Sequence, residues 1–137
     1  MTYLGLRRAR QSSDAEAFGP AVLFLDLVHP DRVSLNVSPD QETEAAKWAA
    51  LSQQAQTARE RLLVVSAGHP RRRVRELAQE AQVKLANAHQ ASGRQASDVA
   101  KHEGDPEWRA HALKAYAEAD AAMRKLINAH FKWFGRS

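Results

Sequence analysis

Apolar residues recur at intervals of three and four along most of the chain after Ser38, which is the spacing of one buried helix face. The first such stripe consists of Trp48, Leu51, Ala55, Ala58, Leu62 and Val65. The sequence Ser38-Pro39-Asp40-Gln41 before it combines a hydroxyl N-cap, a proline in the first helical position and a Gln in the third. Because glycine is common just after a helix, Gly68 marks an end, and the pattern predicts a helix over residues 39–67.

Two further helices are predicted by the same spacing. Residues 70–92 contain a stripe made of Val74, Leu77, Ala78, Ala81, Leu85 and Ala88. Residues 105–134 open at Asp105-Pro106-Glu107 and contain a stripe made of Trp108, Ala112, Ala115, Ala119, Ala122, Leu126, Ala129 and Trp133. The break at Gly68-His69-Pro70 is so short that the first two helices must run antiparallel. We therefore expect a mostly α-helical chain with an Ala-rich, antiparallel three-helix bundle over residues 39–137.

The N-terminal segment, residues 1–38, has a different pattern. Apolar and polar residues alternate over 33–37, and residues 21–28 form an apolar run with β-branched and aromatic side chains. The sequence between these runs, His29-Pro30-Asp31-Arg32, is typical of turns. The pattern predicts a β-hairpin over about residues 21–37.

An alternative for this segment is a helix that begins at the capping box Ser13-Asp14-Ala15-Glu16. We expect Gly19-Pro20 to interrupt it after one or two turns, because an interior proline removes a hydrogen bond and clashes with the preceding turn. Two strands alone are only marginally stable in water. The hairpin is therefore expected to pack on the bundle, to recruit residues 3–8 as a third strand, or to pair with another chain and cause self-association.

The composition is that of one folded domain: 44% of the 137 residues are hydrophobic and 26% are charged. The chain has no cysteine, which excludes disulfides, thiolate zinc sites and a cysteine nucleophile. Its longest apolar run contains Asp26 and is far too short to span a membrane. No secretory signal follows the basic residues near the N-terminus, so a cytoplasmic location is expected.

The six histidines show no spacing typical of a metal site. His89, His111 and His130 lie beside predicted helix stripes, where histidine is usually a boundary residue with its polar edge in water. The chain also lacks the short motifs of metalloproteases, serine hydrolases and nucleotide-binding enzymes. We therefore expect no catalytic residue, no metal and no cofactor.

Positive charge is concentrated in the second half of the chain. The net charge of the whole chain is +4. In the predicted helix hairpin, arginines of both helices would meet at one tip, namely Arg59, Arg61, Arg71, Arg72, Arg73 and Arg75. Several cations at a helix N-terminus oppose the helix dipole, so some compensation is expected, and guanidinium groups match the geometry of phosphate, nucleic acid or an acidic protein surface. The alternative is a solvated loop without a ligand.

Aromatic side chains crowd the last predicted turn. Phe131 and Phe134 flank Ile127, and Trp133 continues the apolar stripe, so apolar surface covers more than half of the helix circumference. One neighbouring helix cannot bury all of this surface. Either the N-terminal hairpin covers it, or it anchors a partner protein, or it docks on a membrane surface.

Together these features predict a non-catalytic protein–protein interaction or assembly module, structural or adaptor in kind, that self-associates or docks on a larger partner. Its predicted contacts are the hairpin edge and the side chains of Ile127, Phe131, Trp133 and Phe134. The alternative function is that of a nucleic-acid-associated accessory protein that binds phosphates through the six-arginine tip.

Overall fold

The computed structural model describes the backbone of residues 3–35, 41–100 and 106–135, and the side chains of residues 14–33, 42–43, 45–97 and 106–132. These residues form five helices and contain no strand: α1 (Tyr3–Leu27), α2 (Pro30–Leu35), α3 (Gln41–Gly68), α4 (Arg72–Ala100) and α5 (Pro106–Gly135). The expected helical bundle is confirmed, whereas the N-terminal β-hairpin is wrong. The predicted helix start at Ser38-Pro39-Asp40 lies outside the described residues.

Residues 21–27, expected as the first strand, belong to α1, and residues 33–35 of the expected second strand belong to α2. Residues 36–37 of that strand lie outside the described part of the chain. The burial pattern gives the reason, because the buried residues in and before this run lie on one side of a helix: Phe18, Ala21, Phe24, Leu25 and Val28. Such a short apolar run cannot be assigned to a strand or a helix from its sequence alone.

The helix α1 also passes through Gly19-Pro20, where an interruption was expected. A residue before proline is normally kept out of the helical region, because its Cβ meets the proline ring, and glycine has no Cβ. An interior proline still costs about 3 kcal/mol. Burial of Phe18, Phe24 and Leu25, each worth about 1.5–3 kcal/mol, exceeds that cost.

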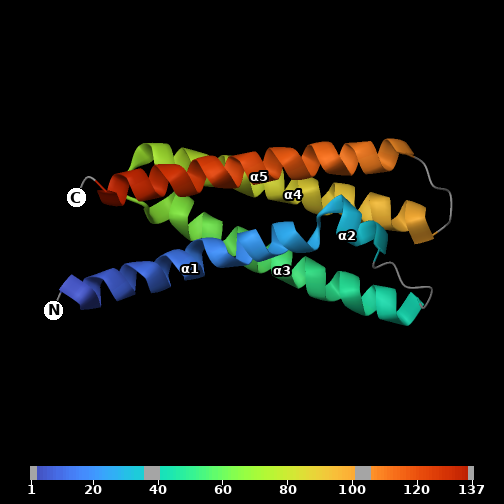
Figure 1. Ribbon diagram of the computed structural model, residues 1–137, viewed down its shortest axis with the longest axis horizontal. Coiled ribbons are helices and arrows are strands. Elements are labelled where there is room, and N and C mark those ends of the chain that lie inside the picture. The colour runs from blue at the N-terminus through green and yellow to red at the C-terminus, as the bar shows by residue number, and fades with distance from the viewer. Residues whose placement is uncertain (1–2, 36–40, 101–105, 136–137) are drawn as a thin grey trace.

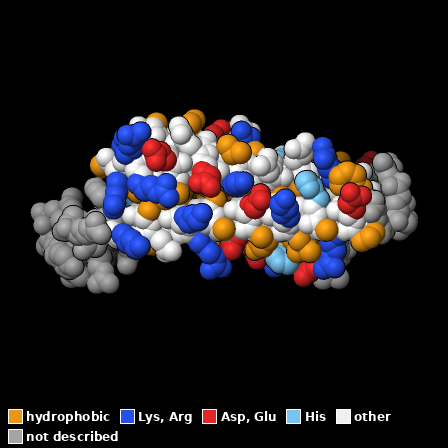
Figure 2. Space-filling model, turned by 90° about the horizontal axis from the view of Figure 1, so that it is seen from above, with side chains coloured by type: hydrophobic (Ala, Val, Ile, Leu, Met, Phe, Trp, Pro, Cys, Tyr) orange, Lys and Arg blue, Asp and Glu red, His pale blue; other side chains and the backbone are white. Residues whose placement is uncertain are grey.

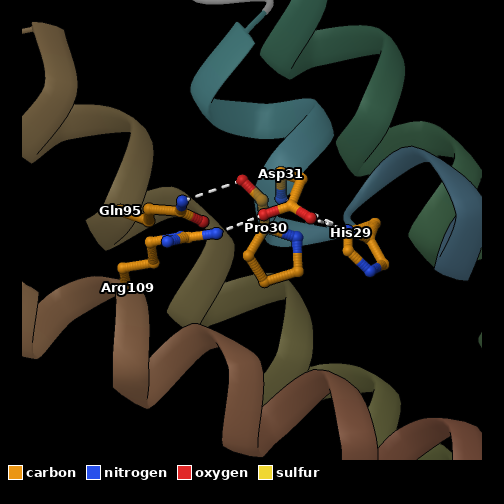
Figure 3. A network of polar contacts seen from close by, with 5 residues as sticks. All are labelled: His29, Pro30, Asp31, Gln95 and Arg109. Atoms are coloured by element: carbon orange, nitrogen blue, oxygen red, sulfur yellow. Dashed lines mark hydrogen bonds and ion pairs between the residues drawn. The ribbon is translucent and has the colours of Figure 1, made fainter.

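The sequence His29-Pro30-Asp31 is a helix start rather than a hairpin turn. Pro30 is the first residue of α2, and the backbone N–H of Asp31 donates to Nδ1 of His29 (3.2 Å), which caps the helix. Polar contacts hold α2 to three neighbours. Nε2 of Gln95 in α4 donates to the carbonyl oxygen of Pro30 (2.9 Å), and Arg109 in α5 pairs with Asp31 (Figure 3). Arg32 also pairs with Asp26 of α1 (3.5 Å).

The four long helices pack in chain order. Helix α1 lies along α3, α3 along α4, and α4 along α5, while α1 and α5 touch over a much smaller area. Figure 1 shows that the turn between α3 and α4 and the C-terminal end of α5 lie at the same end of the molecule. Small residues fill much of the core, including Ala21, Ala58, Ala78, Ala81 and Ala119, which are fully or almost fully buried. None of the described helices is apolar over a length that could cross a bilayer.

The predicted core stripe of α4 is confirmed, since its six residues from Val74 to Ala88 are buried. Helix α4 then continues through Gly93 to Ala100, because Ala91, Gln95 and Ala96 extend the buried face. This extension reaches α2, where Gln95 makes its contact with Pro30.

Candidate interaction site: a groove between α1 and α5

An apolar groove of about 680 Å³ lies between α1 and α5, which touch over a smaller area than the other neighbouring long helices do. One face of α1 and two residues of α5 line it: Asp14, Ala15, Phe18, Gly19, Val22, Leu23, Asp26, Ile127 and Phe131. The α1 residues recur every four positions, mostly as adjacent pairs, so they lie on one side of that helix. From Asp14 to Asp26 this side extends about 18 Å.

Several large apolar side chains of the groove are open to water. The exposed fractions of Val22, Leu23 and Phe131 are 51%, 50% and 53%, whereas Phe18 is buried and forms part of the core. A Cβ added at Gly19 would meet no atom within 4 Å outside its chain neighbours, so this glycine leaves a notch in the α1 wall. The groove therefore combines the buried Phe18 with apolar side chains that water reaches.

Two of the four side chains predicted to bind a partner line this groove, namely Ile127 and Phe131. The side chains of Trp133 and Phe134, the other two, lie outside the described residues, although the backbone of both belongs to α5. The α1 wall was not predicted, because residues 21–28 were assigned to a strand. Once that run is a helix, Val22 and Leu23 lie on the side opposite to the buried Phe24 and Leu25.

Beside the groove, α1, α5 and the α3–α4 turn are joined by a chain of polar contacts through His130. Nε2 of His130 lies 2.6 Å from Oδ1 of Asp14 in α1, and its Nδ1 lies 3.1 Å from Nε2 of His69 in the α3–α4 turn. The backbone N–H of Arg71 donates to Nδ1 of His69 (3.0 Å). The His130 ring also meets Phe18 and Phe131 edge-on, at centroid distances of 5.1 and 5.9 Å.

These contacts determine where the protons lie. Because the Arg71 N–H can only donate, Nδ1 of His69 accepts and the proton of that ring is on Nε2. This proton points to Nδ1 of His130, so the proton of His130 is on Nε2, where it is donated to the Asp14 carboxylate. Burial, followed by the neighbouring His130 ring, lowers the pKa of His69 from its ordinary value of 6.5, which agrees with a neutral ring.

Each ring nitrogen in the contacts that run from Asp14 through His130 and His69 to the Arg71 N–H, here called the histidine chain, has a hydrogen-bond partner. The lone pair of each neutral ring already accepts a hydrogen bond, so neither ring offers a base or a metal ligand without breaking a contact. Among the described side chains, no three His, Cys, Asp or Glu residues are grouped as a metal site would require. What the arrangement does is fix α1, α5 and the α3–α4 turn relative to one another.

The arginines of the predicted tip form two groups. Arg71, Arg72, Arg73 and Arg75 follow the α3–α4 turn, and Figure 2 shows Lys and Arg side chains gathered toward this end of the molecule. Nη1 of Arg75 donates to the carbonyl oxygens of His69 (2.7 Å) and Pro70 (3.1 Å), and Arg72 pairs with Glu76.

Arg59 and Arg61 are exposed residues of α3 that lie about 10–14 Å along the helix axis from its end at Gly68. Arg59 is close enough to His89 of α4 to lower the pKa of that histidine, an effect second to burial of the ring. These two side chains therefore lie along the bundle rather than at the turn.

Comparisons with known proteins give no match: no protein-family model, no curated protein and no solved structure corresponds to this chain. The functional interpretation therefore depends on the geometry of the groove and the side chains beside it.

Proposed function

We propose that this chain is a non-catalytic protein-interaction module whose α1–α5 groove receives one amphipathic helix of a partner protein. The main support is the group of half-exposed apolar side chains at a hollow, Val22, Leu23 and Phe131. Contiguous apolar surface of this kind usually marks a site of interaction. A helix matches the α1 wall in length, because about 18 Å corresponds to about three turns.

The charges of the groove indicate the chemistry of the partner. Its two polar lining residues, Asp14 and Asp26, are both acidic and lie at opposite ends of the α1 wall. Asp14 accepts a hydrogen bond from His130, and Asp26 pairs with Arg32 of α2 at 3.5 Å, so each carboxylate keeps only part of its acceptor capacity for a partner. A partner helix with apolar residues at positions i, i+3, i+4 and i+7 and with Lys or Arg beside them would place cations near these carboxylates. We therefore propose a basic amphipathic helix as the occupant.

The test uses a fluorescein-labelled, Ala-rich peptide of about 18 residues, which forms about 27 Å of helix, with Leu on one stripe and Lys beside it. Its dissociation constant is measured by fluorescence anisotropy with the full chain and two double variants. V22Q/L23Q removes two apolar side chains of the groove. L63Q/V64Q is the matched control, because it makes the same exchange at two exposed residues of α3 that do not line the groove.

Burial of the exposed half of one Leu and one Val contributes about 1.5–3 kcal/mol in total. V22Q/L23Q should therefore weaken peptide binding about 10- to 100-fold, whereas L63Q/V64Q should change it less than about twofold. A peptide with Glu in place of Lys should bind more weakly than the Lys peptide at low salt. No binding to the wild-type chain, or equal binding by all three proteins, would contradict the proposal.

Light scattering of the unlabelled chain, with an absorbance ratio that reports nucleic acid, tests two other occupants. A mass that rises with concentration in the wild type but not in V22Q/L23Q would mean that a second copy supplies the helix. Nucleic acid that dissociates at high salt, and that is lost when Arg71, Arg72, Arg73 and Arg75 are neutralised, would favour the nucleic-acid alternative instead.

A further inference from the structure

The histidine chain and the groove share side chains. Asp14, Phe18 and Phe131 line the groove, and each of them contacts the ring of His130. The ring is nine-tenths buried, so it cannot turn without moving at least one of these neighbours. The position of His130 thus affects both walls of the groove.

The hydrogen bonds of the His69 and His130 rings accommodate two ring protons and no more. One belongs to Nε2 of His69 and one to Nε2 of His130, and the Arg71 N–H closes the chain at its other end. A third proton on Nδ1 of His130 would face the N–H of His69. If His69 changed tautomer to accept it, its own Nδ1–H would face the Arg71 N–H. Every arrangement with a third proton therefore places two donors against each other.

The turn that holds His69 is fastened more firmly than the His130 ring. The backbone N–H of His69 donates to the carbonyl oxygen of Val65 (3.0 Å). The Arg75 guanidinium donates to the carbonyl oxygens of His69 and Pro70. Adjustment to a third proton is therefore expected on the His130 side, which is the side of the groove.

We propose that protonation of the His69–His130 pair weakens helix binding in the α1–α5 groove, so that the site releases its partner in mild acid. This inference rests on the proposed function of the groove and adds its regulation. The charged and titratable groups that face the pair among the described residues are Asp14 from α1, Arg71 from the α3–α4 turn and Arg75 from α4. The two arginines add to the cost of a positive ring at His69.

The test measures the dissociation constant of the same labelled peptide between about pH 7.5 and about pH 5, with circular dichroism at each pH to follow the fold. The wild-type chain should lose about tenfold in affinity while its helix signal is kept. H69Q should vary less than about twofold, because a Gln amide donates to a neutral His130 and accepts from a protonated one. Both proteins keep Asp14 and Asp26, so the carboxylates of the groove are the same in both.

H89Q is the matched control. His89 is also a partly buried histidine with a lowered pKa, but its ring contacts Ser52 and Phe24, neither of which lines the groove. H89Q should therefore keep the wild-type response to pH. An affinity that does not change with pH in the wild type, an equal loss in H69Q, or a loss that follows unfolding would overturn the inference. Absence of binding at about pH 7.5 would instead overturn the proposed function itself, and this inference with it.

Discussion

Replacement of Pro20 by Ala tests the continuity of α1, the feature in which the fold departs most from the sequence-based expectation. Ala supplies the backbone N–H that proline lacks and removes the clash of the ring with the preceding turn. In a helix interior this exchange is worth about 3 kcal/mol in favour of Ala. The gain depends on helical structure on both sides of Pro20, as α1 has it.

Part of that gain is offset by lost packing. Pro20 is partly buried, and the exchange removes two methylene groups that are worth about 0.8 kcal/mol each when fully buried. Subtraction of about half of their sum leaves a net increase in the free energy of unfolding of about 2 kcal/mol. The hydrogen bond from Nε2 of Gln54 to the Pro20 carbonyl oxygen (3.4 Å) is available to Ala as well.

Urea denaturation of wild type, P20A and P70A measures the effect. Pro70 is the matched control, because it lies in the α3–α4 turn, where proline restricts the unfolded chain without breaking a helix. P70A should lower the free energy of unfolding by about 0.4–1 kcal/mol, which is opposite in sign to P20A. A destabilised P20A would refute the continuous helix, since it would mean that the chain needs a break at Pro20.

Two further predictions concern stability. Burial lowers the pKa values of His69 and His89 below 6.5, so the unfolded chain binds more protons than the folded chain in mild acid. The free energy of unfolding should therefore fall as the pH drops from about 6.5 toward the lowered values. Urea titrations at about pH 7.5 and 5.5 measure this change, and a rise in stability on acidification would contradict the prediction. Q95A should cost about 1–3 kcal/mol, because it removes a buried side chain together with its hydrogen bond to the Pro30 carbonyl oxygen. R109A breaks an exposed ion pair and should cost less than about 1 kcal/mol. Thermal unfolding compares the two variants, and equal losses would contradict the assigned roles.

The bundle could be predicted from the sequence because apolar residues recur at helical spacing over many residues of its helices. The stripe of α4 from Val74 to Ala88 covers four turns and is buried as expected. The N-terminal segment offered only an eight-residue apolar run that Asp26 interrupts, and the preference of Val and Phe for strands outweighed a helical spacing that was also present. Packing of Phe24 and Leu25 in the core then decides in favour of helix.

One overlooked pattern could have corrected this prediction. His29-Pro30 and His69-Pro70 are similar in sequence, and in both the histidine Nδ1 accepts the backbone N–H two residues later, at the start of the next helix. The predicted helix over residues 70–92 was begun at the proline of His69-Pro70, yet His29-Pro30 was assigned to a hairpin turn. Consistent use of this pattern would have predicted α2.

The histidine chain could not be predicted in the same way. His130 and Asp14 are 116 positions apart, and His130 and His69 are 61 apart. No local spacing brings these three side chains together, since their meeting depends on how α1, α5 and the α3–α4 turn pack. The sequence placed His130 at a boundary with water, whereas the side chain is buried and hydrogen bonded at both nitrogens.

The most direct test of the α1–α5 groove as a helix-binding site is a map of backbone amide chemical shifts on addition of the unlabelled Lys peptide to the isotope-labelled chain. The account predicts that the largest changes lie in residues 14–26 of α1 and 127–131 of α5, and that V22Q/L23Q abolishes them. Changes centred on residues 71–75 at the start of α4, or spread evenly over the chain, would contradict it.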